Sequence, residues 1–204
     1  MIRSSVRIGI ATIAALAVSL GSAAIAQAKQ HCHPAGSRTL ATDSYARVYG
    51  QGGNAYVCIE SSGKRTLLSA ATPGADRFAL GGKWVGWSSS DASDATVLPH
   101  SIVTVMRIPD HFVNDQWYPF QTNQPVVKIV VISDGAAAWA LAPAPGDDTT
   151  DAFIQGTDRR NHPADQFSDD LPNNPVVGSS LHLVGGKTVG WSYAGGQRGT
   201  QALY

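Results

Sequence analysis

The feature that most constrains the fold is a repeated phrase. GKWVGW at residues 82–87 and GKTVGW at residues 186–191 are near-copies, and DGAAAW at residues 134–139 lies midway between them. Each phrase begins at a glycine-containing turn and follows a strand-like stretch, and the three end, 52 residues apart, in Trp87, Trp139 and Trp191. Self-similarity at such a period indicates an array of small units that stack to bury their shared faces.

Each unit reads as a strand, a tight turn and a second strand. The Asp134-Gly135 pair between two apolar runs is the strongest hairpin signal in the chain. GNAYVC at residues 53–58 is a further candidate, with Cys58 where the others have Trp, and a third strand candidate such as SIVTVMRI follows most hairpins. The sequence therefore predicts an all-β fold of tandem three-stranded antiparallel meanders. That array is propeller-like, whether open, incomplete or closed by a homodimer, and a β-sandwich is the alternative.

The beginning of the chain reads as an export signal. Arg3 and Arg7 precede an apolar run over residues 8–20, and small residues continue to Ala28. Cleavage is expected after Ala28, with Ala24 and Ala26 as alternatives. No later segment reaches about 18 consecutive apolar residues, the length that spans a bilayer. The prediction is a signal peptide over 1–28 and a single β-repeat domain over 29–204, secreted or in the cell-envelope space, with no membrane span.

Export determines how the two cysteines are interpreted. In an oxidising compartment a pair of cysteines is usually bonded, so we predict a disulfide between Cys32 and Cys58. The composition, with 43% hydrophobic and 15% charged residues, is that of an ordinary folded domain. Lysine and arginine are scattered rather than gathered in a stripe, and we therefore expect no nucleic-acid partner.

The order of the motifs resembles a group of secreted bacterial proteins of uncharacterised function with degenerate, TolB-like β-propeller-type repeats. The motifs are an early Cys, an ARVY strand, a YxC strand and the Trp-ending hairpins. They correspond here to Cys32, residues 46–49, residues 56–58 and the hairpins that end at Trp87, Trp139 and Trp191. The resemblance implies a propeller-like fold and no particular activity, because a fold does not fix a function.

Function is expected in the segments between the units. The first long segment, residues 109–125, carries an aromatic cluster that can stack on a sugar ring or anchor a partner protein: Phe112, Trp117, Tyr118 and Phe120. The alternative is that these rings fold back and close one end of the array. The leading hypothesis is a non-catalytic exported domain that binds an unidentified protein or saccharide through such segments.

A second long segment, residues 145–175, holds seven aspartates. Clustered carboxylates suit Ca²⁺, but their order matches no calcium loop, so a solvated acidic loop is the simpler interpretation. Asp158, His162 and Asp165 lie close in sequence, and a histidine beside carboxylates can act as a general base. An exported hydrolase or metal-dependent protein that uses residues 147–170 is therefore the alternative function, although no nucleophile motif accompanies it.

The mature N-terminus offers a third site. Cleavage after Ala28 gives a chain that begins Lys29-Gln30-His31, and an amine with His at position three supplies the nitrogen ligands that Cu²⁺ prefers. His33 lies close enough to add another ligand. The competing interpretation is an ordinary mobile N-terminus, and no cofactor is expected for the protein.

Overall fold

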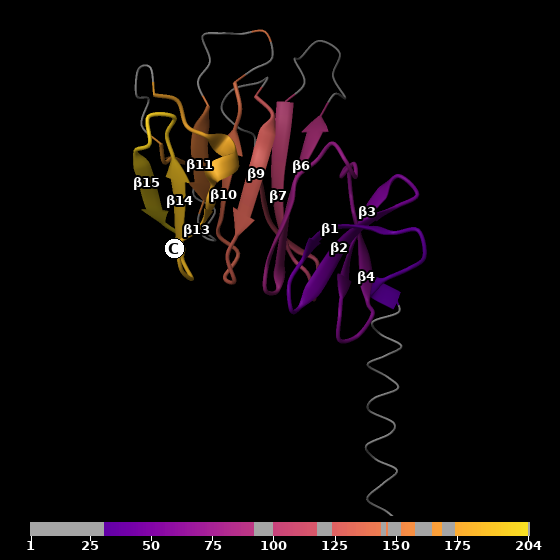
Figure 1. Cartoon of the computed structure of the whole chain (residues 1–204). Helices are drawn as coiled ribbons and strands as arrows, with labels where there is room; N and C mark the ends of the chain where they lie inside the picture. Colours follow the sequence, from indigo (N-terminus) through magenta and orange to yellow (C-terminus); the bar gives the residue numbers. More distant parts are fainter. Residues whose placement is uncertain are drawn as a thin grey trace, which may run out of the picture.

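The computed structural model describes residues 31–91, 100–117, 124–143, 146, 152–157, 165–168 and 174–203. These residues form four antiparallel sheets that follow one another along the chain (Figure 1). The first sheet contains β1 (Arg38–Thr42), β2 (Ala46–Gln51), β3 (Asn54–Ile59) and β4 (Arg65–Leu68). The second contains β5 (Phe78–Gly81), β6 (Trp84–Asp91), β7 (His100–Arg107) and β8 (Phe112–Trp117).

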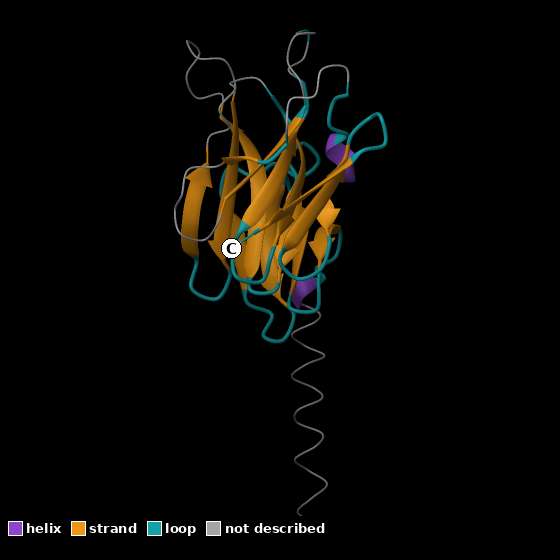
Figure 2. Ribbon diagram, turned by 90° about the vertical axis from the view of Figure 1, so that its left-hand side faces the viewer, coloured by secondary structure: helices purple, strands orange, loops and turns teal. Residues whose placement is uncertain are grey.

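The third sheet contains β9 (Val126–Val131), β10 (Ala137–Leu141), β11 (Phe153–Thr157) and β12 (Asp165–Gln166). A 3-10 turn, η1 (Gly178–Ser180), leads into the fourth sheet, which contains β13 (His182–Leu183), β14 (Thr188–Ser192) and β15 (Arg198–Ala202). Strands make up most of the described chain, and the turns gather at their ends (Figure 2). The predicted all-β, propeller-like class is confirmed. Among the described residues, no helix has the length and the apolar character of a membrane span.

The repeated tryptophans are buried between successive sheets. Trp87, Trp139 and Trp191 lie in the second strands β6, β10 and β14, and each is at most 3% exposed. Each belongs to the core cluster between its own sheet and the preceding one: Trp87 packs with residues of the first sheet, Trp139 with the second and Trp191 with the third. The phrase recurs in the sequence because every added sheet must fill the same interface.

The first sheet has no preceding sheet, and its outer face is covered differently. The predicted disulfide is present between Cys32 and Cys58, which are both fully buried beside Tyr49. Tyr49 stacks on Tyr56 with ring centroids 5.5 Å apart. Arg47, only 4% exposed, donates hydrogen bonds to the backbone oxygen of Cys32 and to side chains of residues 37 and 39. The bonded segment around Cys32 therefore takes the place of a neighbouring sheet.

Neighbouring sheets are also joined at their turns by aspartates. Asp43, between β1 and β2, accepts a hydrogen bond from the backbone N–H of Gly82 in the turn between β5 and β6, at 3.1 Å. Asp134, between β9 and β10, pairs with Lys187 in the turn between β13 and β14, at 2.8 Å. Gly135, in the predicted Asp-Gly turn, has a φ of 96°, which an L side chain rarely adopts. The strong hairpin signal is thus confirmed.

Four details differ from the sequence-based expectation. The first three sheets have four strands rather than three. The first strand β1 was not predicted, because it is an edge strand whose residues are mostly exposed and show no apolar run. Cys58 is not the counterpart of the tryptophans, since it lies in the third strand of its sheet. The segments 109–125 and 145–175 are not only loops, because they supply β8, β11 and β12.

Candidate functional site

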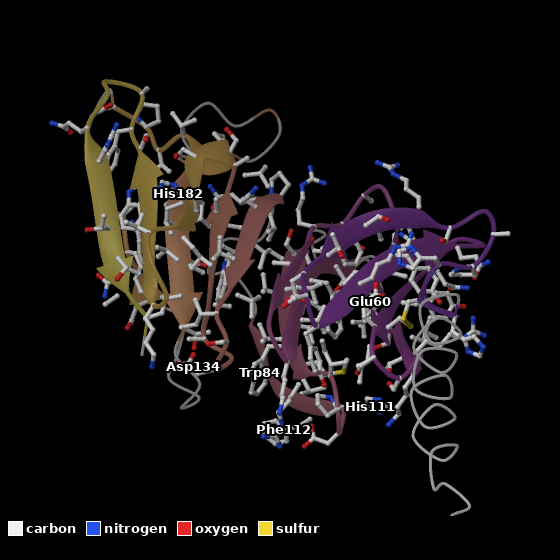
Figure 3. The ribbon with its side chains drawn as sticks, turned by 60° about the horizontal axis from the view of Figure 1, so that its bottom comes forward. Glu60, Trp84, His111, Phe112, Asp134 and His182 are labelled. Carbon is white, nitrogen blue, oxygen red and sulfur yellow. A yellow bond between two sulfur atoms is a disulfide. The ribbon has the colours of Figure 1, made fainter. Side chains whose placement is uncertain are left out.

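An exposed aromatic ring marks the start of β8. Phe112 is 52% exposed, and the guanidinium of Arg107 lies over its ring, 5.5 Å from the centroid. The same guanidinium is 5.8 Å from the ring centre of Trp84, which is largely buried at the start of β6. Asp110 binds Arg107 through two hydrogen bonds, of 3.0 and 2.5 Å. We call these four residues the Phe112 platform, and Figure 3 shows Phe112 and Trp84 at the lower edge of the molecule in that view.

Local structure explains why these side chains meet. Arg107 and Phe112 are cross-strand partners at the ends of β7 and β8, so their side chains share one face of the sheet. Asp110 lies in the turn between them, three residues after Arg107, and also accepts a hydrogen bond from the backbone N–H of Phe112, at 3.4 Å. Asp110 therefore holds the guanidinium of Arg107 in the position where it lies over the ring of Phe112.

The turn of the platform is tied to the first sheet. His111 adopts a φ of 59°, which is uncommon for a residue other than glycine. Its Nε2 is hydrogen-bonded to the hydroxyl of Thr66 in β4, at a distance of 2.7 Å. Such a conformation persists where surrounding contacts hold it. The contact therefore fixes the position of the turn, and with it the direction in which Phe112 points.

The charges of the platform are mutually satisfied. The hydrogen bonds from Arg107 are the main reason that the pKa of Asp110 lies below its ordinary value, and the N–H of Phe112 adds to them. Asp110 in turn raises the pKa of Arg107. Because Asp110 and Arg107 are hydrogen-bonded to each other, this pair offers no general base and no nucleophile. The exposed part of Phe112 is an apolar surface that another molecule can contact.

Of the other members of the predicted aromatic cluster, the structure describes only the backbone of Trp117. Trp117 is the last residue of β8, which places its backbone at the far end of that strand. Tyr118 and Phe120 lie outside the described residues. The structure therefore places Phe112 on the surface, and the roles of Trp117, Tyr118 and Phe120 stay predictions.

The structure describes only some of the predicted metal and acid–base residues. His33 pairs with Glu60, with Nε2 and Oε1 3.3 Å apart, and His31 is exposed. No group of three potential metal ligands occurs in the described ranges, and Lys29 lies outside them. Asp165 is exposed in the edge strand β12, opposite Gly156, whereas Asp158 and His162 lie outside the described residues. The copper, calcium and hydrolase hypotheses thus stay untested predictions.

Phe112 was singled out from the sequence, whereas the residues that contact it were not. The spacing of Arg107 and Asp110 across the turn was a visible signal, since side chains three residues apart in a tight turn can pair. Trp84 gave no signal, because it reaches the platform only through the pairing of β6 with β7.

The sequence matches no protein-family model and no curated protein sequence. Among solved structures, the chain is similar to the computationally designed Ika4 protein, with a TM-score of 0.53 and 13% identity over 84% of this chain and 94% of Ika4. TolB from Acinetobacter baumannii matches 80% of this chain with 42% of its own, at 14% identity and a TM-score of 0.48. A KlHsv2 variant with loop 6CD replaced by a Gly-Ser linker matches 74% of this chain with 48% of its own, at 12% identity and a TM-score of 0.49. What this chain shares with Ika4 is a propeller-like arrangement of sheets.

Proposed function

We propose that the protein is an exported, non-catalytic, propeller-like domain that binds a protein or a saccharide through a surface that begins at Phe112. The observation that supports this proposal is the fixed exposure of the Phe112 ring. Phe112 is 52% exposed, and the guanidinium of Arg107 that lies over its ring is held by Asp110 and also lies over the largely buried Trp84. A ring that is already ordered loses little conformational entropy when it binds.

The composition of the platform fits recognition. Aromatic side chains and arginine are enriched among the residues that dominate binding energy at interfaces. The ring offers an apolar face, and Arg107 lies beside it, so a partner can combine apolar contact with hydrogen bonding at the edge. Export is supported by the signal-like N-terminus and is consistent with the disulfide, which persists in oxidising compartments.

Two experiments test the proposal at this residue. In the first, p-benzoylphenylalanine replaces Phe112, and the protein is photo-cross-linked in its own secretion medium and on immobilised cell-wall polysaccharides. In the second, the variant Phe112→Ala is compared with wild type on a glycan array and against any protein that the first experiment captured. The matched control is Leu67, which is 54% exposed in β4 of the first sheet.

The proposal expects cross-links at position 112 and none at position 67, and binding that falls about tenfold in Phe112→Ala but not in Leu67→Ala. Thermal unfolding of both variants is measured alongside. Equal cross-linking at the two positions, no cross-linking at all, or unaltered binding by Phe112→Ala would refute it. A large loss of thermal stability in Phe112→Ala would show instead that the ring supports the fold.

A further inference from the structure

The outer face of the fourth sheet carries a groove of about 340 Å³, which is within the size range of small-molecule sites. Its lining includes His182, Val184, Gly190, Ser192, Arg198 and Thr200. Figure 3 shows His182 in the fourth sheet, well away from Phe112. The groove is therefore separate from the Phe112 platform.

The strand register places the polar lining residues on one face. His182 of β13 is opposite Gly190 of β14, and Gly190 is opposite Thr200 of β15, which makes one row across the sheet. Ser192 and Arg198 are partners in the next row on the same face, because side chains alternate along a strand. The other face of β14 carries Val189 and Trp191, which are buried in the core against the third sheet.

Gly190 forms the floor of the groove. A β-carbon added there would come within 2.6 Å of a methyl carbon of Val184 and 3.5 Å of Nε2 of His182. The absence of a side chain at this position lets the imidazole and the valine lie directly over the backbone. The space beyond them is bounded on the β15 side by Arg198 and Thr200.

A backbone contact determines which nitrogen of His182 carries the proton. Nδ1 is 2.7 Å from the carbonyl oxygen of Ser180, and a carbonyl can only accept a hydrogen bond, so Nδ1 is the donor. In the neutral ring Nε2 is then an acceptor. The groove thus offers a fixed acceptor, which fits a hydroxyl group that donates to it.

The opposite side of the groove is suited to an anion. Arg198 is exposed and is in no ion pair with any residue that the structure describes, and the lining includes no carboxylate. A guanidinium presents paired donors that match the two oxygens of a carboxylate. The hydroxyls of Ser192 and Thr200, beside Arg198, can accept or donate further hydrogen bonds.

We propose that this groove binds one unit of an acidic saccharide. Its carboxylate pairs with Arg198, and one of its hydroxyls donates to Nε2 of His182 across Gly190. The guanidinium donors of Arg198 together with the acceptor Nε2 of His182 select a ligand that carries both a carboxylate and a hydroxyl. Neither a neutral sugar nor a simple carboxylate satisfies both sides.

The test is a titration of the ¹⁵N-labelled protein by two-dimensional NMR with glucuronate, glucose and acetate. Glucuronate should shift the backbone amides of Gly190, Gly199 and Thr200 saturably, with a dissociation constant of about 1–10 mM, as is usual for a single small ligand in an open site. Glucose and acetate should each bind about tenfold more weakly. The variant Arg198→Gln should weaken glucuronate binding about fivefold or more. Arg65→Gln, the same change of charge on the first sheet, should leave it unaltered.

Three results would overturn the proposal. If acetate binds as well as glucuronate, the groove is a general anion site and His182 recognises no hydroxyl. If Arg65→Gln weakens binding as much as Arg198→Gln does, the attraction is that of the net charge. If glucuronate shifts no amide of β14 or β15, the groove does not bind an acidic sugar. The variant His182→Phe provides the second measurement, because it should bring glucuronate binding down to the level of acetate.

Discussion

Removing the disulfide between Cys32 and Cys58 is the most informative perturbation of the fold. The bridge joins residues 26 positions apart, and the chain-entropy relation for a loop of that length gives about 3 kcal/mol of stabilisation. Both cysteines are fully buried against Tyr49, so replacing them with alanine also removes buried sulfur atoms, which adds about 1–2 kcal/mol. We therefore expect the variant Cys32→Ala/Cys58→Ala to lose about 4–5 kcal/mol of unfolding free energy.

A loss of this size should be easily measured. For a domain of this length, each 1 kcal/mol lowers the melting temperature by about 2–4 °C, so the double variant should melt about 8–20 °C below wild type. Urea unfolding is measured on the oxidised wild type, the reduced wild type and the double variant. The difference between the first two isolates the cross-link, and the difference between the last two isolates the buried sulfur.

The same variant should loosen one segment before the others. Arg47 donates to the backbone oxygen of Cys32, and this contact depends on the bridge that keeps the segment over the first sheet. Hydrogen exchange of residues 31–37 should therefore accelerate in the native state of the double variant. If both the unfolding free energy and this exchange stay within about 1 kcal/mol of the oxidised wild type, the reasoning that the bridge caps the first sheet is refuted.

Three further perturbations are predicted from single contacts. Gly156→Ala would place a β-carbon 2.1 Å from the ring of Phe167, so urea unfolding should show a loss of about 1–3 kcal/mol of unfolding free energy. The control Gly186→Ala, whose β-carbon would meet nothing within 4 Å, should stay within about 0.5 kcal/mol of wild type. Burial raises the pKa of Asp76 above 3.8 despite opposing contacts, so the folded state holds that proton more tightly than the unfolded state does. Stability should therefore decline as the pH rises from 3.8 through the folded pKa, and Asp76→Asn should remove this decline and be the more stable protein near neutral pH. Lys187→Met removes a largely exposed ion pair and should cost less than about 1 kcal/mol by the same assay, and less still at high salt.

The repeat made the fold class predictable. Trp87, Trp139 and Trp191 recur because each fills the interface with the preceding sheet, and packing of that kind leaves a periodic signal in the sequence. The strand β11 left no such signal, although all five of its residues are buried. It lies among aspartates and prolines, and its burial depends on contacts with β10 and with the fourth sheet that local composition does not reveal.

The candidate sites were predictable only in part. Phe112 was singled out as a candidate binding residue, because an apolar ring among polar residues stands out in the sequence. His182 and Arg198 were not, since they lie 16 residues apart and share a face only through the register of three strands. Cross-strand register is set by turn geometry and by packing as a whole, and one sequence does not display it directly.

The stacking of sheets in a row gives this molecule two unlike ends. Three core clusters each join one sheet to the next, and in the described residues none joins the first sheet to the fourth. The outer face of the first sheet is covered by the disulfide-bonded segment around Cys32, whereas the fourth sheet is held only by its interface with the third. Local opening in such a linear assembly is expected to spread inward from its weaker end. The protection of backbone amides from hydrogen exchange should therefore decrease from β10 towards β15, because local unfolding begins at the C-terminal sheet.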